Sequence, residues 1–260
     1  MKSTRKFKHS GTLGDIVYSL ALVKYFGGGD FYLHLGQIDW IAQHYYGTQS
    51  DTFHQGRMTE KDFEFMEDFM LAQDYITDFK ILEPKTTEIT NNLDRFRPLF
   101  VGHPANYIAT YCMAFNITDP TIINQIGEGP WLRVLNPKTI SGKTIVVNRT
   151  PRGFSPPGCN PVWTQWKNEG IDQKSIFVGL PDEYIEFKKL TNWDLEYYPT
   201  KNMLELAEVI AGCEQFLGNQ SVALSIAQGL RVPYAYETRR DLPMDRNESY
   251  FTNHADGKYF

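Results

Sequence analysis

The sequence predicts an α/β protein with two Rossmann-like domains that face each other across a cleft. The chain opens with a strand, a glycine-containing turn and a helix over residues 5–26, and residues 143–237 alternate strands with helices. Residues 116–142, which include Pro120, Pro130 and Pro137, separate these two parts. Alternating strands and helices form parallel sheets with right-handed crossovers, and proline clusters mark loops, so we expect one sheet on each side of this stretch.

The first domain, residues 1–138, has the less regular pattern. Its predicted strands are residues 5–9, 31–35, 76–82 and 99–102, and its predicted helices are residues 13–25, 59–72 and 105–115. Gly27, Gly28 and Gly29 follow a helix and precede a strand, so we interpret them as a connecting turn and not as a phosphate loop.

The second domain, residues 139–240, is regular. Its predicted strands are residues 143–147, 175–179, 195–198, 215–217 and 232–236, and its predicted helices are residues 162–169, 182–190, 203–213 and 221–230. The third of these helices has the clearest apolar stripe, which includes Met203, Ala207 and Ile210. The polar C-terminal tail, residues 241–260, is expected to pack back across the first half or to be mobile.

Composition excludes several classes of protein. A chain of 260 residues with 42% hydrophobic residues can fill sizeable cores, and a net charge of -5 argues against nucleic-acid binding. No apolar run is long enough to span a bilayer. Cys112, Cys159 and Cys213 form no C-x-x-C pair, which favours a reducing, cytoplasmic environment, and the six histidines show no metal-ligand spacing. P-loop, G-x-S-x-G and complete G-x-G-x-x-G motifs are also absent.

A candidate anion site lies at Gly218, Asn219, Gln220 and Ser221, between a predicted strand and a predicted helix. Gly218 allows a ligand to approach the backbone, and the Ser221 hydroxyl can cap the helix. Helix N-termini bind phosphates because their first N–H groups have no partner within the helix. Glu237 ends the next strand, where a carboxylate can accept hydrogen bonds from ribose hydroxyls; the alternative is an ordinary surface charge.

A second group of candidates follows the first strand of this domain, at Asn148, Arg149, Thr150 and Arg152. The planar guanidinium of arginine matches phosphate oxygens, so the two arginines suggest a diphosphate clamp. The alternative is a solvated surface loop. Gly179 ends the neighbouring strand and leaves room for a nucleoside, although an ordinary turn explains it equally well.

In the first domain the candidate residue is Asp15, in the run Ser10 to Asp15 between the first strand and the first helix. A carboxylate there is placed to act as a general base. The structural alternative is a capping box in which Asp15 lies three residues after the N-cap Thr12. Gly11, Thr12 and Gly14 complete this candidate acceptor or phosphate side of the site.

Two segments resemble a known family. The run from Gly14 to Leu20 resembles the amino-terminal signature of the heptosyltransferase-like glycosyltransferases of family 9, and residues 216–233 resemble their carboxyl-terminal signature. The resemblance implies a GT-B fold with an acceptor-side first domain and a nucleotide-sugar-binding second domain. It also implies metal-independent, inverting transfer without a cofactor, with Asp15 as the base and the diphosphate stabilised by helix termini and basic side chains.

The sequence departs from this family in and just after the turn Gly218 to Ser221, which the resemblance implies is the donor-binding turn and which we call the donor turn. Gln220 stands where the family has Asp, Val222 where it has Gly, and Ser225 where it has His. We therefore keep two hypotheses: a glycosyltransferase that acts on the hydroxyl of an unknown glycan, glycolipid or other acceptor, and a non-catalytic protein that binds a nucleotide or nucleotide-sugar on the same scaffold. A nucleotide-sugar epimerase is a third reading, weakened by the lack of a further catalytic acid pair.

Overall fold

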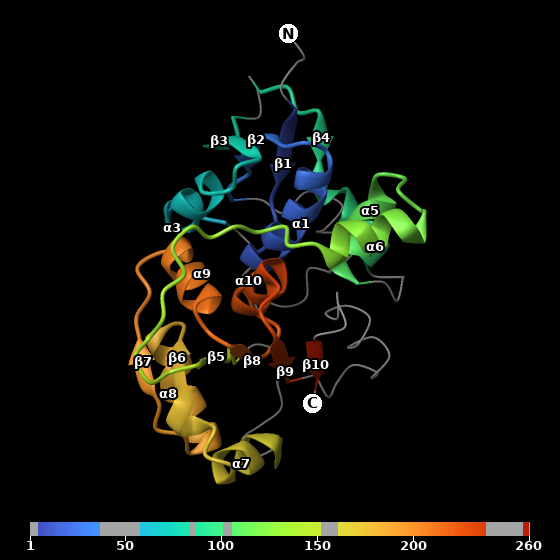
Figure 1. Ribbon diagram of the computed structural model, residues 1–260. Helices are drawn as coiled ribbons and strands as arrows, with labels where there is room; N and C mark the ends of the chain where they lie inside the picture. Colours follow the sequence, from blue (N-terminus) through green and yellow to red (C-terminus); the bar gives the residue numbers. More distant parts are fainter. Residues whose placement is uncertain are drawn as a thin grey trace. The chain divides into compact units, whose positions relative to one another are not determined.

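A computed structural model describes residues 5–36, 58–83, 87–100, 106–151, 161–237 and 257–259 (Figure 1). The chain divides into two compact units, Met1–Arg133 and Val134–Phe260. This division falls within residues 116–142, where the sequence analysis places the domain boundary. Each unit is an α/β structure with a parallel sheet, so the predicted α/β class with one parallel sheet in each part of the chain is confirmed.

The first unit contains a four-stranded sheet in the order β3-β2-β1-β4. Its strands are β1 (Lys6–His9), β2 (Gly29–Leu33), β3 (Ile76–Ile81) and β4 (Asn91–Asn92). Its helices are α1 (Leu13–Tyr25), α3 (Glu60–Leu71), the 3₁₀ helix η2 (Leu93–Phe96), α4 (Arg97–Phe100), α5 (Tyr107–Ala114) and α6 (Pro120–Glu128). The chain runs outward from β1 to β3 and then returns to β4 on the other side of β1. The carboxyl ends of β1 and β4 therefore flank the topological switch point, where open α/β sheets bind ligands.

Helix α1 lies at the centre of the first core. Its residues from Asp15 to Val23 are all buried, so α1 is a core helix and not a surface helix with one apolar face. The indole N–H of Trp131 donates a hydrogen bond to the Val17 carbonyl oxygen at 3.2 Å. This burial fixes the orientation of the first turn of α1, which carries Asp15.

The second unit contains a six-stranded parallel sheet in the order β10-β9-β8-β5-β6-β7. Its strands are β5 (Ile145–Asn148), β6 (Ser175–Val178), β7 (Glu196–Tyr198), β8 (Gln215–Gly218), β9 (Tyr234–Tyr236) and β10 (Gly257–Tyr259). Its helices are α7 (Pro161–Asn168), the 3₁₀ helix η3 (Asp172–Lys174), α8 (Pro181–Thr191), α9 (Met203–Ala211) and α10 (Val222–Leu230). The strand order reverses between β5 and β8, so the second switch point lies at their carboxyl ends.

An aromatic cluster fills the core of the second unit. The rings of Trp163, Phe187 and Trp193 pack edge to face, with centroids 5.3 to 5.9 Å apart. Edge-to-face packing suits the quadrupoles of aromatic rings. The indole N–H of Trp193 is satisfied by the Trp163 carbonyl oxygen at 3.0 Å.

Three sequence predictions are wrong in detail. Residues 99 and 100 belong to helix α4 and not to a strand, because the Asn92 side chain accepts from the Asp94 N–H at 3.1 Å and starts a helical turn there. The stretch 116–142 contains helix α6, in which Pro120 occupies the first turn behind the Asp119 cap and therefore starts the helix instead of breaking it.

The third error concerns the C-terminal tail. Residues 257–259 form β10 and pair in parallel with β9 in the second sheet, not with the first half. Residues 241–256 lie outside the described part of the chain.

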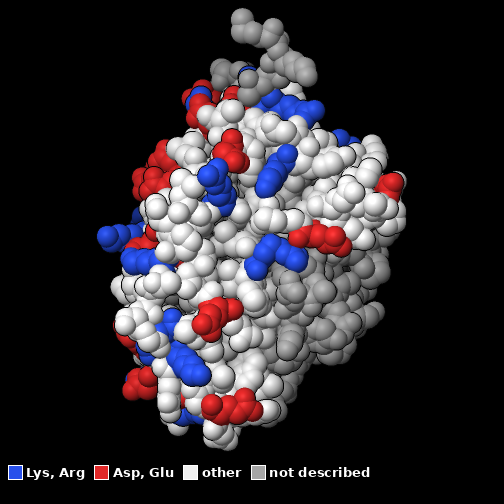
Figure 2. All heavy atoms as spheres, viewed as in Figure 1, with Lys and Arg blue, Asp and Glu red and all other residues white. Residues whose placement is uncertain are grey.

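Surface charge agrees with the low net charge. On the described part of the face in Figure 2, Lys and Arg side chains alternate with Asp and Glu and form no continuous basic patch. Within the described residues, no helix is long and apolar enough to cross a membrane.

Candidate functional site

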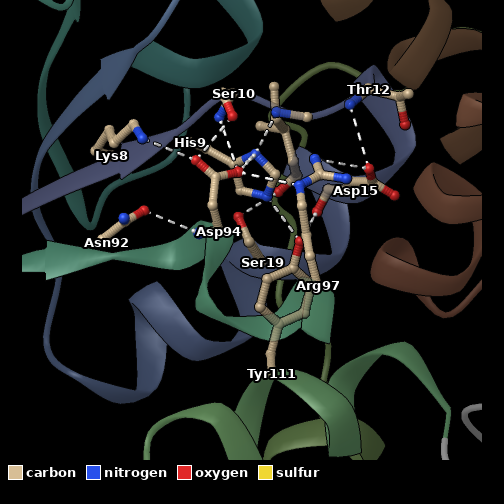
Figure 3. A network of polar contacts seen from close by, with 12 residues as sticks. Lys8, His9, Ser10, Thr12, Asp15, Ser19, Asn92, Asp94, Arg97 and Tyr111 are labelled. Carbon is tan, nitrogen blue, oxygen red and sulfur yellow. Dashed lines mark hydrogen bonds and ion pairs between the residues drawn. The ribbon is translucent and has the colours of Figure 1, made fainter. Parts of the chain in front are cut away.

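Polar groups gather at the switch point of the first unit (Figure 3). Ser10 follows β1 and Asp94 follows β4, so the parallel strands bring the two residues together. Asp94 accepts a hydrogen bond from the Ser10 N–H at 3.1 Å and another from the Ser10 hydroxyl at 2.8 Å. The Lys8 ammonium lies 3.2 Å from the same carboxylate. Asp94 is almost completely buried and is a fixed anchor between the two strand ends.

Asp15 lies beside this anchor, in the first turn of α1. Its Oδ2 accepts from the Thr12 N–H at 3.2 Å and from Nη2 of Arg97 at 3.4 Å. Its Oδ1 makes no hydrogen bond to any described residue, and 11% of the side chain is exposed. The capping box that the sequence offered as the structural alternative is therefore present, and the role of Asp15 as a general base stays a prediction.

The charges around Asp94 determine its ionisation. Burial alone would raise the pKa of Asp94, but neighbouring positive charge from His9, Arg97 and Lys8 and the Ser10 hydrogen bond outweigh it and lower the pKa to about 2. His9 contributes positive charge only in acid, because burial lowers the pKa of its own imidazole to about 4. Near neutral pH the cations that stabilise Asp94 are therefore Arg97 and Lys8.

The hydrogen bonds of His9 define its neutral tautomer. The Gly11 N–H donates to Nδ1 at 2.7 Å, so Nδ1 is an acceptor and the ring proton lies on Nε2. Nε2 is 2.7 Å from the Tyr111 hydroxyl, which donates to the Asp15 carbonyl oxygen at 2.9 Å. The 3.5 Å approach of Nδ1 to Asp94 is therefore not an ion pair near neutral pH. This chain fastens the backbone of Asp15 to α5.

Gly11 is required here by packing. A Cβ atom at this position would lie 2.2 Å from Nη2 of Arg97 and 2.9 Å from Oδ2 of Asp15. Any side chain would separate these two groups. Thr12 occupies the N-cap position and Gly14 is the second residue of α1, so the predicted positions of both are confirmed, but a contact of either with substrate stays a prediction.

In the second unit, Asn219 links the ends of β5 and β8. Its side-chain oxygen accepts from the Thr150 N–H at 3.0 Å, and its amide donates to the Thr150 carbonyl oxygen at 2.7 Å. The completely buried Asn219 side chain thus continues the β5–β8 pairing by one step. The structure assigns this residue a role in holding the two strand ends together.

Arg149 and Glu237, which the sequence assigned to separate ligand groups, form one ion pair. Nε of Arg149 lies 2.6 Å from Oε2 of Glu237, and Nη2 lies 3.3 Å from Oε1. Each side chain is only 6% exposed. The two predicted roles, a phosphate clamp and a ribose acceptor, are therefore not independent of each other.

The glycine at the end of β8 also has a structural reason. A Cβ on Gly218 would lie 2.3 Å from the Asn148 carbonyl oxygen. The close approach that glycine allows here is to β5, whereas the sequence analysis assigned it to a ligand. Ser221 is the N-cap of α10, and its hydroxyl accepts from the Leu224 N–H at 3.4 Å as predicted. Gln220 lies half-buried between them.

A carboxylate that the sequence analysis missed, Glu183, lies in the first turn of α8, where its Oε2 accepts from the Leu180 N–H at 2.9 Å. Gly179 has a φ of +139°, and a Cβ on it would lie 2.7 Å from Nδ2 of Asn148 and 2.7 Å from Oε2 of Glu183. Burial raises the pKa of Glu183, while the Leu180 N–H and the Asn148 amide oppose the shift. The spacing Gly179-x-x-x-Glu183 after a strand was the available signal. Asn148 also donates to the Val178 carbonyl oxygen at 2.9 Å, and its Oδ1 is buried without a hydrogen-bond partner.

Two further predictions, the role of Arg152 and the expected lack of a metal, are tested only in part or not at all. Arg152 lies outside the described residues. Among the residues that the structure describes, no group of three or more His, Cys, Asp or Glu side chains could hold a metal ion.

Solved structures place the fold in a known class, because several glycosyltransferases share it. A family 9 glycosyltransferase from Veillonella parvula is 10% identical, with a TM-score of 0.53 over 99% of this chain and 86% of its own. The Escherichia coli heptosyltransferase WaaC, solved with ADP, is 13% identical, with a TM-score of 0.51 over 98% and 92%. The iron-containing, dodecameric glycosyltransferase TibC of enterotoxigenic E. coli is 13% identical, with a TM-score of 0.50 over 98% and 63%.

These likenesses confirm the fold that the two sequence signatures implied. No protein-family model matches the sequence, and a search of curated proteins finds no match.

Proposed function

We propose that the protein is an inverting, metal-independent glycosyltransferase that transfers a sugar from a nucleotide-sugar to an acceptor hydroxyl, with Asp15 as the general base. One observation carries this proposal. Oδ2 of Asp15 is held by the Thr12 N–H and Arg97, while Oδ1 has no partner among the described residues and the largely buried side chain keeps 11% exposure. A general base needs a carboxylate oxygen that is oriented and free to receive a proton.

The chemistry follows from that geometry. The acceptor hydroxyl donates its proton to Oδ1 while its oxygen forms a bond to the anomeric carbon of the donor. The bond from this carbon to the diphosphate oxygen breaks on the opposite face, which inverts the configuration, and the electron pair leaves with the nucleoside diphosphate. In-line attack requires the acceptor oxygen, the anomeric carbon and the leaving diphosphate oxygen to lie along one line. In this proposal the protein holds them in that geometry, without a metal.

The donor is assigned to the switch point of the second unit. The first N–H groups of α10, behind the Ser221 cap, suit a diphosphate because the helix dipole favours negative charge there. Glu183 and the unpartnered Oδ1 of Asn148 suit the hydroxyl and amine donors of a nucleoside. The buried Arg149–Glu237 pair lies at the same strand ends, and WaaC, a protein of this fold, was solved with ADP.

Donor binding is tested first, by thermal unfolding of the whole protein with ADP, GDP, UDP and their sugar conjugates. A ligand that binds the native state stabilises it by RT ln(1 + L/Kd), where L is the free ligand concentration, so the melting temperature rises with the logarithm of the ligand concentration above Kd. Glu183→Gln should weaken the best nucleotide about tenfold or more, as expected when a hydrogen bond to a charged group is lost. A complete lack of stabilisation at millimolar nucleotide would refute the donor site.

The base is tested by release of nucleoside diphosphate from the best nucleotide-sugar. Asp15→Asn should lower turnover by about 10² to 10⁴, the usual contribution of a general base. Asp62→Asn is the matched control, because Thr59 and Asp62 form the same cap at the start of α3, with Oδ2 accepting from the Thr59 N–H at 2.7 Å. Both variants lose the charge of the capping carboxylate, but only the first loses a base. Equal turnover in the two would contradict the assignment.

Metal independence is tested in the same assay with EDTA, which should leave turnover unchanged. The second hypothesis, a non-catalytic nucleotide-sugar binding protein, is motivated by the altered donor turn. Ser225, which replaces the histidine of the family, is completely buried, and its hydroxyl donates to the Val222 carbonyl oxygen at 2.7 Å. A nucleotide-sugar that stabilises the protein without turnover, with wild type and Asp15→Asn alike, would favour this hypothesis.

A further inference from the structure

Arg97 connects Asp15 to a second carboxylate that comes from another part of the sequence. Its Nε lies 3.4 Å from Oδ1 of Asp94, and its Nη2 lies 3.4 Å from Oδ2 of Asp15 (Figure 3). The Arg97 side chain is only 6% exposed. A guanidinium offers several donors in a rigid plane, so a single arginine can fix two carboxylates relative to each other.

The other end of this connection is rigid. Asp94 receives two hydrogen bonds from Ser10 and an ion pair from Lys8, and its side chain is 1% exposed. Because Ser10 directly follows β1 and Asp94 lies in η2, two residues after β4, these contacts fasten the end of β1 to the turn that follows β4. Through Asp94, the Arg97 side chain is therefore connected to the ends of the sheet strands.

Gly11, in the segment between β1 and α1, leaves space for the Arg97 guanidinium. Nη2 of Arg97 lies where a Cβ on Gly11 would meet it at 2.2 Å. The glycine in the segment between β1 and α1 thus serves the contact between Arg97 and Asp15. The Tyr111 hydroxyl holds the backbone of Asp15 at the same time, through its 2.9 Å bond to the carbonyl oxygen.

We propose that Arg97 and Asp94 are positioning residues for the base: they hold Oδ2 of Asp15 so that Oδ1 faces the acceptor hydroxyl. The inference rests on the proposed function, because it assigns these residues a task in the reaction of Asp15. Arg97 and Asp94 act through Asp15 and do not take the proton. The sequence signature alone points to neither residue, since both lie about 80 positions away from Asp15.

The test is a double-mutant cycle on turnover with Arg97→Met, Asp15→Asn and the double variant. Arg97→Met should lower kcat about 10²-fold, because a small misplacement of a reacting group costs about that factor. The donor KM should change less than about twofold, since the donor is assigned to the second unit. In the Asp15→Asn background the same substitution should change the residual rate less than about threefold, because groups that act as one unit are not additive.

Arg95→Met is the matched control. Arg95 lies two residues away in η2 and is exposed, with its guanidinium 5.3 Å from the centre of the Phe115 ring. This variant should keep wild-type kcat. If Arg97→Met fails to fold, the cycle is measured with Arg97→Lys, in which one ammonium can reach only one of the two carboxylates; kcat should then fall about tenfold.

The outcomes separate the two proposals. If Asp15→Asn lowers turnover to a measurable residual rate but the Arg97 and Asp15 effects multiply in the double variant, Arg97 acts independently and the positioning role is wrong. The role is also wrong if folded Arg97→Met keeps full kcat. If Asp15→Asn itself leaves turnover unchanged, the proposed base is wrong, and the positioning role is refuted with it.

Discussion

The buried Arg149–Glu237 pair allows a sharp test of what holds the second unit together. Glu237→Gln keeps the shape of the side chain but leaves the Arg149 guanidinium without its carboxylate, in a place where each side chain is 6% exposed. Breaking a buried pair from one side costs about 3–5 kcal/mol, because the remaining charge stays buried without its opposite charge. Arg149→Met should cost a similar amount.

This free energy corresponds to a large shift in melting temperature. A unit of about 130 residues has an unfolding entropy of about 0.27 kcal/mol/K, so a loss of 3–5 kcal/mol lowers the melting temperature by about 11–19 °C. The double variant Arg149→Met, Glu237→Met removes both charges and should lie within about 1 kcal/mol of wild type. Calorimetry or urea unfolding of wild type, Arg149→Met, Glu237→Met and the double variant closes the cycle and gives the coupling directly.

The same four proteins decide between the sequence-based role of Arg149 and its structural role. If the pair only supports the site, the double variant binds its nucleotide with nearly wild-type affinity. A tenfold or greater loss in this stable variant would show that Arg149 contacts the phosphates, as the sequence suggested. A loss of less than about 1 kcal/mol in Glu237→Gln would refute the reasoning on burial.

Two further predictions concern stability. Between about pH 6.5 and 4 the first unit should lose about 3 kcal/mol, because the unfolded chain protonates His9 while the folded protein keeps it neutral until its pKa of about 4; His9→Gln should flatten urea-unfolding free energies over this range. From about pH 4 to 2 a further loss of about 2 kcal/mol should follow as Asp94, with its pKa lowered to about 2, is protonated. Gly218→Ala should cost about 1–3 kcal/mol through its clash with β5, whereas Gly129→Ala, whose Cβ would meet nothing nearer than 3.9 Å, should be neutral or slightly stabilising in the same assay.

Periodicity predicted most of the fold, because strands and helices of the second unit are short, apolar and cleanly separated. Helix α6 was missed because proline has two meanings: it interrupts a helix interior but favours the first turn, and only the preceding Asp119 distinguishes them. Strand β4 has two residues and no apolar pattern, so only pairing with β1 reveals it.

The site was predicted in part. Asp15 could be found because it immediately follows a strand–turn, and Ser221 because its cap is local. Arg97 and Asp94 could not, since their contacts with Asp15 and Ser10 depend on the order of strands in the sheet. Arg149 and Glu237 were singled out correctly as unusual charges, but their 88-residue separation hid that they face each other.

Strand β10 forms one edge of the second sheet, and it follows the other strands of this sheet in the sequence. Residues 257–259 cover the hydrogen-bonding edge of β9, whose three residues are all buried. An uncovered strand edge of aromatic residues is a template for pairing with another chain. During synthesis the edge of β9 therefore stays unpaired until residue 259 has left the ribosome. A protein shortened after β9 would retain both switch-point clusters but would tend to associate with other chains through this unpaired edge.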